Sequence, residues 1–210
     1  MKFNRIFNLI LVCIAICCGL YLGIDKMISG DIYSALIRFA IVPVMLLPLI
    51  LRKVFHREIG PKLETIYLLF VFCAHFLGSI IDLYHSVPGY DKVMHLLSGS
   101  VSALVALYVL IKLNQYSEKS LLFNVLFIIA FTIMIAGFWE YYEYTCDQLF
   151  QKDAQNVLTT GVGDTMQDMI AATIGSILVI IMYLYEVLSH SNWFITRFMK
   201  GEQTMCTAIR

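Results

Sequence analysis

The segment FWEYYEYTCD, residues 138–147, decides how the rest of the chain folds. It closes the uncharged apolar run 121–139, which is long enough to cross a bilayer as a helix. At helical spacing its carboxylates Glu140, Glu143 and Asp147 lie on one face, about one turn apart. Glu140 remains near membrane depth, where an ionised carboxylate is costly unless a cation or a proton accompanies it.

Composition places the whole chain in a membrane. Of its 210 residues 60% are hydrophobic and only 14% are charged, and the apolar residues come in long blocks. We therefore predict an all-α fold, a polytopic transmembrane helical bundle. The net charge is zero, so nothing indicates a nucleic-acid partner. The six cysteines show no paired CxxC spacing, so we expect no disulfide framework.

Six apolar blocks predict six spans. The first is interpreted as an uncleaved span, because no signal-peptide cleavage pattern follows it. The second contains Pro43 and Pro48, which are tolerated in spanning helices and are expected to kink it. The tail 192–200 is either a short interfacial helix or a frayed basic end. The predicted spans are 6–24, 32–51, 63–81, 93–113, 121–144 and 165–188.

Basic residues predict the orientation. Only Lys26, Lys92 and Lys152 fall in the loops of one side, and the positive-inside rule makes the other side cytoplasmic, with both termini there. We expect one integral domain in a bacterial inner membrane, with parts 1–62, 63–188 (a four-helix core) and 189–210. The basic residues of the cytoplasmic side are Lys2, Arg5, Arg52, Lys53, Arg57, Lys62, Lys112, Lys119, Arg197, Lys200 and Arg210.

Acids and imidazoles gather at the extracytoplasmic helix ends. Asp91 and His95 open the fourth span at i,i+4 spacing, and Asp164 and Asp168 open the sixth in the same way. The nearby cations, Arg38 and Lys92, are too few to neutralise these acids together with those of residues 138–147. The remaining carboxylates must be protonated, solvated or bound to cations.

These residue types favour a divalent metal. Carboxylates with imidazole suit Zn, Mn or Fe, and carboxylates alone suit Mg or Ca. A cluster of carboxylates that shares protons is the alternative. We predict Zn, Mn or Mg, with His95 and Glu140 as the first ligands. The further candidate ligands are Asp91, Asp168, Asp164 and Asp147.

Several features also have structural explanations. The helix dipole favours acids at helix N-termini, which covers Asp91 and Asp164. His75 is either a deep member of the cluster or a core histidine bonded to Ser79 or a backbone carbonyl. His85 is interpreted as a loop residue, with metal ligation as the alternative. Small residues that permit close helix contact are Gly99, Ala103, Ala171, Ala172 and Gly175.

The run DKVMH at residues 91–95 resembles the D-K-x-x-H stretch of VanZ-like membrane proteins. Residues 90–99, 138–147 and 163–175 resemble the bacterial inner-membrane family YjdF, over about 63–188. The YjdF resemblance implies an integral membrane protein with a multi-helix core and implies no reaction, whereas the VanZ relatives suggest cell-envelope work. Those relatives often have Asn where this chain has Ala172.

Three functions remain open. The first is a metal-dependent membrane hydrolase acting on an envelope lipid or a phosphorylated head group, with Glu143 as base and Arg38 or Lys92 holding a phosphate. The second is a proton- or ion-coupled transporter, although sequence alone shows no polar trail toward the cytoplasmic side. The third is an accessory envelope protein whose acids bind a stabilising cation. In each case we expect membrane lipid as the surroundings.

Overall fold

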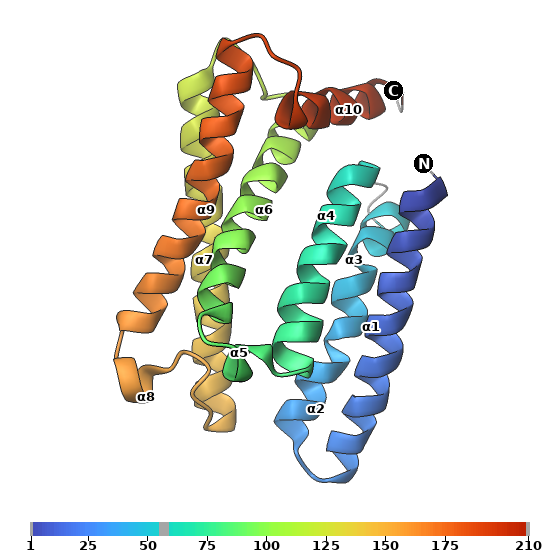
Figure 1. Ribbon diagram of the computed structural model, residues 1–210, viewed down its shortest axis with the longest axis vertical. Coiled ribbons are helices and arrows are strands. Elements are labelled where there is room, and N and C mark those ends of the chain that lie inside the picture. Colours follow the sequence, from blue (N-terminus) through green and yellow to red (C-terminus); the bar gives the residue numbers. More distant parts are fainter. Residues whose placement is uncertain (1, 55–58, 209–210) are drawn as a thin grey trace. The chain divides into compact units, whose positions relative to one another are not determined.

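The computed structural model describes residues 2–54 and 59–208, and every regular element in these ranges is a helix (Figure 1). The predicted all-α class is therefore confirmed. Arg57 and Arg210, two of the basic residues used for the orientation, lie outside the described residues. The helices long and apolar enough to cross a membrane are Asn4–Ile28, Ile32–Lys53, Pro61–Ile80, Tyr90–Lys112, Leu121–Phe150 and Gly163–Leu188.

The chain divides into two compact units, Met1–Asp91 and Lys92–Arg210. The first unit is built on one apolar cluster shared by its long helices. Ala15 of α1, Ile41 and Met45 of α3, Leu68 of α4 and Phe76 of η1 are buried together there. The helices of this unit are α1 (Lys2–Ile28), α2 (Ile32–Phe39), α3 (Ile41–Lys53), α4 (Pro61–Val71), the π-helix η1 (Phe72–Ile80) and α5 (Leu83–Ser86).

The second span, which its prolines were expected to kink, is interrupted at Ala40 near Pro43, whereas Pro48 lies inside a continuous helix. Helix α2 ends at Phe39, and α3 begins at Ile41. Pro43 lacks an N–H, and its ring would clash with the carbonyl of Phe39 in a continuous helix. Asp31 caps the start of α2 by accepting a hydrogen bond from the Ser34 N–H at 3.2 Å. This carboxylate therefore has a structural partner of its own.

The second unit contains the remaining helices, and α7 packs against α9 in antiparallel fashion (Figure 1). Short α8 and the loop before it join the ends of α7 and α9. The division between the units falls within the first turn of α6, which runs without interruption from Asp91 into Lys92. These helices are α6 (Tyr90–Lys112), α7 (Leu121–Phe150), α8 (Val157–Thr160), α9 (Gly163–Leu188) and α10 (Phe194–Ala208).

The tail is helical, and a buried acid anchors it. Glu186 near the end of α9 accepts hydrogen bonds from the backbone N–H groups of Ile195 and Thr196, at 3.1 and 2.8 Å. These amides belong to the first turn of α10, where a helix leaves its N–H groups unpaired. The side chains of Ile195 and Phe198 are buried. The helical alternative for residues 192–200 is thus the correct one, and their interfacial position stays a prediction.

Candidate functional site

Three predicted ligands come together. One ligand atom each of Asp91, His95 and Asp168 lies within 4.8 Å of the others. His95 and Asp168 are 8% and 3% exposed, and Asp91 is half-buried. Asp91 is the last residue of the first unit, but it lies one turn before His95 on the continuous helix α6, which fixes the two side chains relative to each other.

Two glycines set the distance between the helices that carry these ligands. A Cβ atom added at Gly99 of α6 would lie 1.8 Å from the carbonyl oxygen of Ala172 in α9. One added at Gly175 would lie 1.9 Å from the carbonyl oxygen of Leu96. The Ser100 hydroxyl also donates to the Gly175 carbonyl at 3.1 Å. The predicted close contact through small residues is confirmed, and it places His95 opposite Asp168.

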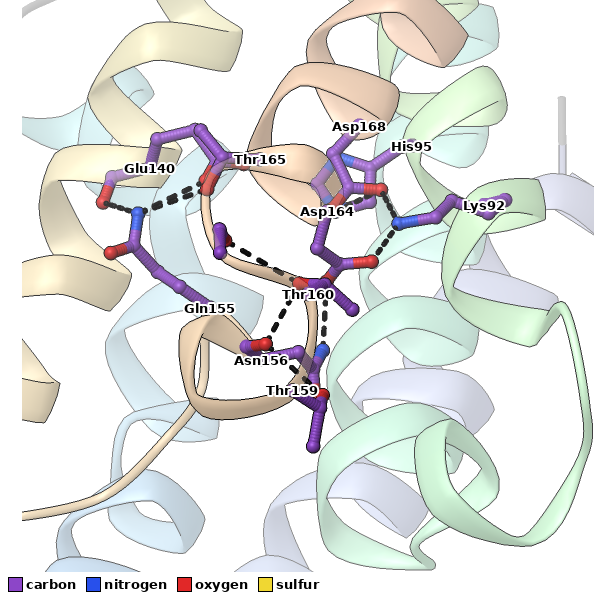
Figure 2. Close-up of polar contacts among 11 residues, drawn as sticks. Lys92, His95, Glu140, Gln155, Asn156, Thr159, Thr160, Asp164, Thr165 and Asp168 are labelled. Atoms are coloured by element: carbon purple, nitrogen blue, oxygen red, sulfur yellow. Dashed lines mark hydrogen bonds and ion pairs between the residues drawn. The ribbon is translucent and has the colours of Figure 1, made fainter.

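Lys92 bridges the two acids of α9. Its Nζ lies 2.6 Å from Oδ1 of Asp164 and 2.6 Å from Oδ1 of Asp168 (Figure 2). The other oxygen of Asp164 accepts from Asn156 Nδ2 at 2.7 Å. Charge-assisted bonds of this kind are strong, especially where water is scarce. Asp164 is thus held by an ammonium and an amide, and its predicted role as a metal ligand stays a prediction, as does phosphate binding by Lys92.

Glu140 lies in a second polar cluster, between α7 and the start of α9 (Figure 2). It is 5% exposed, and its Oε2 accepts from Gln155 Nε2 at 3.2 Å. The same amide nitrogen lies 3.3 Å from Thr165 Oγ1. The second carboxylate oxygen, Oε1, is fully buried and has no hydrogen-bond partner among residues 2–54 and 59–208. Glu140 is not in the group of three ligands above, so its role in metal binding stays a prediction.

The other two acids of residues 138–147 have structural partners. Glu143 Oε1 accepts from Trp139 Nε1 at 2.8 Å. Asp147 accepts from the backbone N–H groups of Ala154 and Gln155, at 2.6 and 3.1 Å. Asp147 thereby holds the loop that brings Gln155 to Glu140. The catalytic role of Glu143 and ligation by Asp147 remain predictions.

Gln155 and Asn156 are the site residues that sequence reasoning missed. Both lie between α7 and α8, and each bonds a carboxylate of the site. Asn156 has φ +53°, a left-handed conformation that Asn tolerates, and its carbonyl accepts from the hydroxyls of Thr159 and Thr160. The one feature of the sequence that could have identified them is the pair of adjacent amide side chains directly before Val-Leu-Thr-Thr-Gly. Amide side chains are too common in loops for this pair to indicate a site.

Residues predicted in the first unit have partners within that unit. Arg38 Nη1 donates to the Ser34 carbonyl at 3.0 Å on its own helix, and a role for Arg38 in substrate binding stays a prediction. His75 Nε2 lies 2.8 Å from the Ile37 carbonyl oxygen, which confirms the alternative of a histidine bonded to a backbone carbonyl. His85 is exposed in the short helix α5 and pairs with Asp82, which directly precedes that helix.

The donor set of Asp91, His95 and Asp168 fits a divalent transition metal. Zinc binds carboxylate oxygen and imidazole nitrogen at about 2.0–2.2 Å, so two ligand atoms on one tetrahedral ion lie roughly 3.3–3.6 Å apart. His95 Nε2 and Asp168 Oδ1 are separated by 3.8 Å, and so need only a small adjustment. Asp168 Oδ1 also contacts Lys92 Nζ, so the ammonium and a bound dication would both contact this one oxygen.

Comparison with known proteins identifies the family. A family model described as "Predicted membrane protein (DUF2238)" matches residues 7–188, most of the chain. No curated protein and no solved structure matches the chain. The chain therefore belongs to the DUF2238 family of predicted membrane proteins. Together with the six apolar helices, this makes it a multi-pass membrane protein.

Proposed function

We propose that this member of the DUF2238 family binds a divalent metal through Asp91, His95 and Asp168 at the extracytoplasmic side of the bacterial cytoplasmic membrane. The observation that carries the proposal is the convergence of the three ligand atoms within 4.8 Å on two helices in backbone contact. Buried carboxylates and imidazole in membrane-spanning helices are costly unless they are paired, and such residues usually mark functional sites. A mixed oxygen and nitrogen donor set favours Zn, Mn or Fe over Ca.

The charge balance of the site supports the same proposal. Within the second unit, Lys92 is bonded to both Asp164 and Asp168. One ammonium opposite two carboxylates leaves a net negative charge among these three groups. A dication bound by Asp91 and Asp168 would offset that excess in surroundings where water screens poorly.

For the reaction, we propose hydrolysis of a phosphorylated lipid head group. The orientation predicted from the positive-inside rule would put the site at the level of the outer head groups. A bound metal would polarise a phosphoryl oxygen and activate water. Lys92, drawn toward Asp164, would then present an ammonium to the phosphate, and Glu143 would accept a proton from water after releasing Trp139. The resemblance to VanZ-like proteins agrees with work in the cell envelope.

Metal content tests the binding proposal. Protein purified without chelator should hold stoichiometric metal, and His95→Ala should lose it together with thermal stability. His85→Ala is the matched control, because its imidazole is exposed and lies outside the candidate site. The proposal fails if the wild-type protein holds no metal and added Zn, Mn or Mg leaves its melting temperature unchanged.

Phosphate release tests the reaction separately. Wild-type protein in micelles that contain a phosphorylated lipid should release phosphate, and a chelator should abolish this. Glu143→Gln should lower turnover while metal content remains, and Glu118→Gln in an exposed loop should behave as wild type. The protein could instead bind metal and yet release no phosphate from any phosphorylated lipid extracted from the cell envelope. That result would indicate a metal-binding accessory protein and contradict the hydrolase proposal.

A further inference from the structure

The buried stripe of α7 carries polar side chains at regular intervals. Its buried residues recur every fourth position from Asn124 through Thr132 to Glu140, with Ile128 and Ala136 between them. Asn124 is 0% and Thr132 1% exposed, so both are sealed from solvent. At 1.5 Å per residue the three polar positions extend over about 24 Å, most of the roughly 30 Å hydrocarbon core of a bilayer.

Each of these three side chains has a buried oxygen with spare hydrogen-bonding capacity. Asn124 Oδ1, Thr132 Oγ1 and Glu140 Oε1 have no partner in the part of the chain that the structure describes. The positions of oxygen and nitrogen in the Asn124 amide are fixed, because its Nδ2 donates to the Ser117 carbonyl, which can only accept. Leaving a buried polar group unpaired is costly, and internal water is its usual partner.

Hydrogen bonds at both ends fix α9 alongside this stripe. At one end Asn124 Nδ2 donates to the Tyr183 hydroxyl at 2.8 Å. At the other end Gln155 Nε2 bonds both Glu140 and Thr165, which are therefore at one level. The helices α7 and α9 are antiparallel (Figure 1). With both ends fixed in this way, the helical rise puts Thr132, midway along the stripe, at the level of Thr173 and Ser176.

The polar groups of α9 at that level are satisfied by their own helix. Ser176 Oγ donates to the Thr173 carbonyl and Thr173 Oγ1 to the Met169 carbonyl, both at 2.8 Å. Hydroxyl groups bonded in this way still have lone pairs that accept from water. At the end near Tyr183, burial raises the pKa of Tyr116, so this phenol keeps its proton at neutral pH. Its ring lies 6.5 Å from that of Tyr183.

We infer that the α7–α9 interface is a path along which protons cross the membrane, passed between internal waters that Asn124, Thr132 and Glu140 hold in line. A proton that enters at the Glu140 end displaces one that leaves beside Asn124 and Tyr116, so no bond other than O–H bonds changes. Net flow requires a counter-ion moving across the membrane. Asn124 and Glu140 each also make a hydrogen bond that holds the helices together, yet Asn124 Oδ1, Thr132 Oγ1 and Glu140 Oε1 have no partner among the described residues.

The path adds an activity that the metal proposal does not contain and does not depend on it. It connects the outer end of the unit, where Lys92 and Asp164 lie, with the predicted cytoplasmic side. Proton transfer along it would suit a carrier or a coupled reaction as well as simple conduction.

Proton flux through the full chain in proteoliposomes tests the inference. The vesicles contain a pH dye and more potassium than the outside solution, and valinomycin lets potassium leave as the counter-ion. The lumen of vesicles with wild-type protein should then acidify faster than that of protein-free vesicles. Thr132→Val keeps the side-chain volume and removes the hydroxyl, and should slow the flux about tenfold, since one lost hydrogen bond of about 1.4 kcal/mol corresponds to that factor. Thr132→Ser should restore it.

The control is Thr145→Val on the same helix, because Thr145 is exposed and its hydroxyl donates to the Tyr141 carbonyl of its own helix. Asn124→Leu blocks the path at its other end and should also slow the flux, which keeps the test decisive if one variant is unstable. Metal content of Thr132→Val should equal that of the wild type. A wild-type rate no higher than that of empty vesicles, or an unchanged rate in Thr132→Val or Asn124→Leu, overturns the inference.

Discussion

The backbone at Gly99 touches the backbone at Ala172, and an added Cβ atom would lie 1.8 Å from the Ala172 carbonyl oxygen. Three residues later on α9, Gly175 makes the reciprocal contact with Leu96 of α6. His95 and Asp168 lie within one turn of these contacts, on the same two helices. The relative position of the two ligands therefore depends on main-chain atoms, which cannot repack as side chains do.

Replacing Gly99 with Ala should separate α6 from α9. No flexible side chain lies in the way of the new methyl group, so the helices must move, at a cost of about 1–3 kcal/mol or more in the free energy of unfolding. Thermal unfolding in detergent should show a lower melting temperature. Metal content should fall with it, because His95 and Asp168 would move apart.

Gly137→Ala on α7 is the control for that substitution. A Cβ atom at Gly137 meets nothing within 4 Å, and Ala favours the helix by about 0.5–1 kcal/mol over Gly. Its melting temperature should be equal to that of the wild type or higher. Equal melting temperatures for Gly99→Ala and Gly137→Ala would contradict the backbone contact.

Lys92→Met should make the protein depend on added cation. The substitution leaves Asp164 and Asp168 without their shared ammonium. In protein treated with a chelator, we expect the free energy of unfolding to fall by about 1–3 kcal/mol. Added Zn or Mn should then raise the melting temperature of Lys92→Met more than that of the wild type, because the dication replaces the lost charge. Lys119→Met in an exposed loop should show neither effect. An equal response of variant and wild type would argue against a cation beside Asp168.

Glu186→Ala should release the start of α10. The two amides that Glu186 accepts from would lose their partner, with a local cost of about 1–3 kcal/mol. Hydrogen exchange at Ile195 and Thr196 should accelerate at least about tenfold, which corresponds to 1.4 kcal/mol. Glu118→Ala provides the baseline for loss of an exposed carboxylate. Unchanged exchange at both amides would show that side-chain packing alone holds α10.

Cysteine labelling should establish the orientation. Leu158 on α8 is highly exposed and lies on the predicted outer side, whereas exposed Lys119 lies on the predicted inner side. A membrane-impermeant maleimide should label Leu158→Cys in intact spheroplasts and Lys119→Cys only after permeabilisation, with the wild type as background. The reverse pattern would place the site in the cytoplasm and remove the proposed access to outer head groups.

Much of the helical architecture could be predicted from sequence, because apolar blocks of bilayer length have few other solutions. The fourth span was expected at 93–113 and is found at Tyr90–Lys112, and the sixth at 165–188 is found at Gly163–Leu188. The fifth extends beyond its expected end at residue 144 to Phe150, because Tyr and Glu continue a helix where hydrophobicity alone stops. The π-helical turn of Phe72–Ile80 has no signal in the apolar pattern.

The site was predictable where residues repeat at helical spacing. Asp91 and His95 on one helix and Asp168 on another were identified in this way, and they converge. The partners of the remaining acids were not predictable, because they depend on the path of a loop. Gln155 reaches Glu140 from the loop between α7 and α8, whose backbone Asp147 binds. No sequence periodicity encodes such a contact.

The glycine contact between α6 and α9 also bears on which ions the proposed metal site would accept. Ligands on helices whose main chains touch can move apart only by separating the helices. A rigid site discriminates by ionic radius, because a larger ion needs longer bonds and more ligands. Calcium takes about six to eight oxygen ligands at about 2.3–2.6 Å, so a set of two carboxylates and one imidazole should bind it more weakly than ions that accept few ligands with bonds near 2.1 Å. Replacing Gly99 or Gly175 with a larger residue would separate α6 from α9, increase the distance between the ligands and shift the preference of the site toward larger ions.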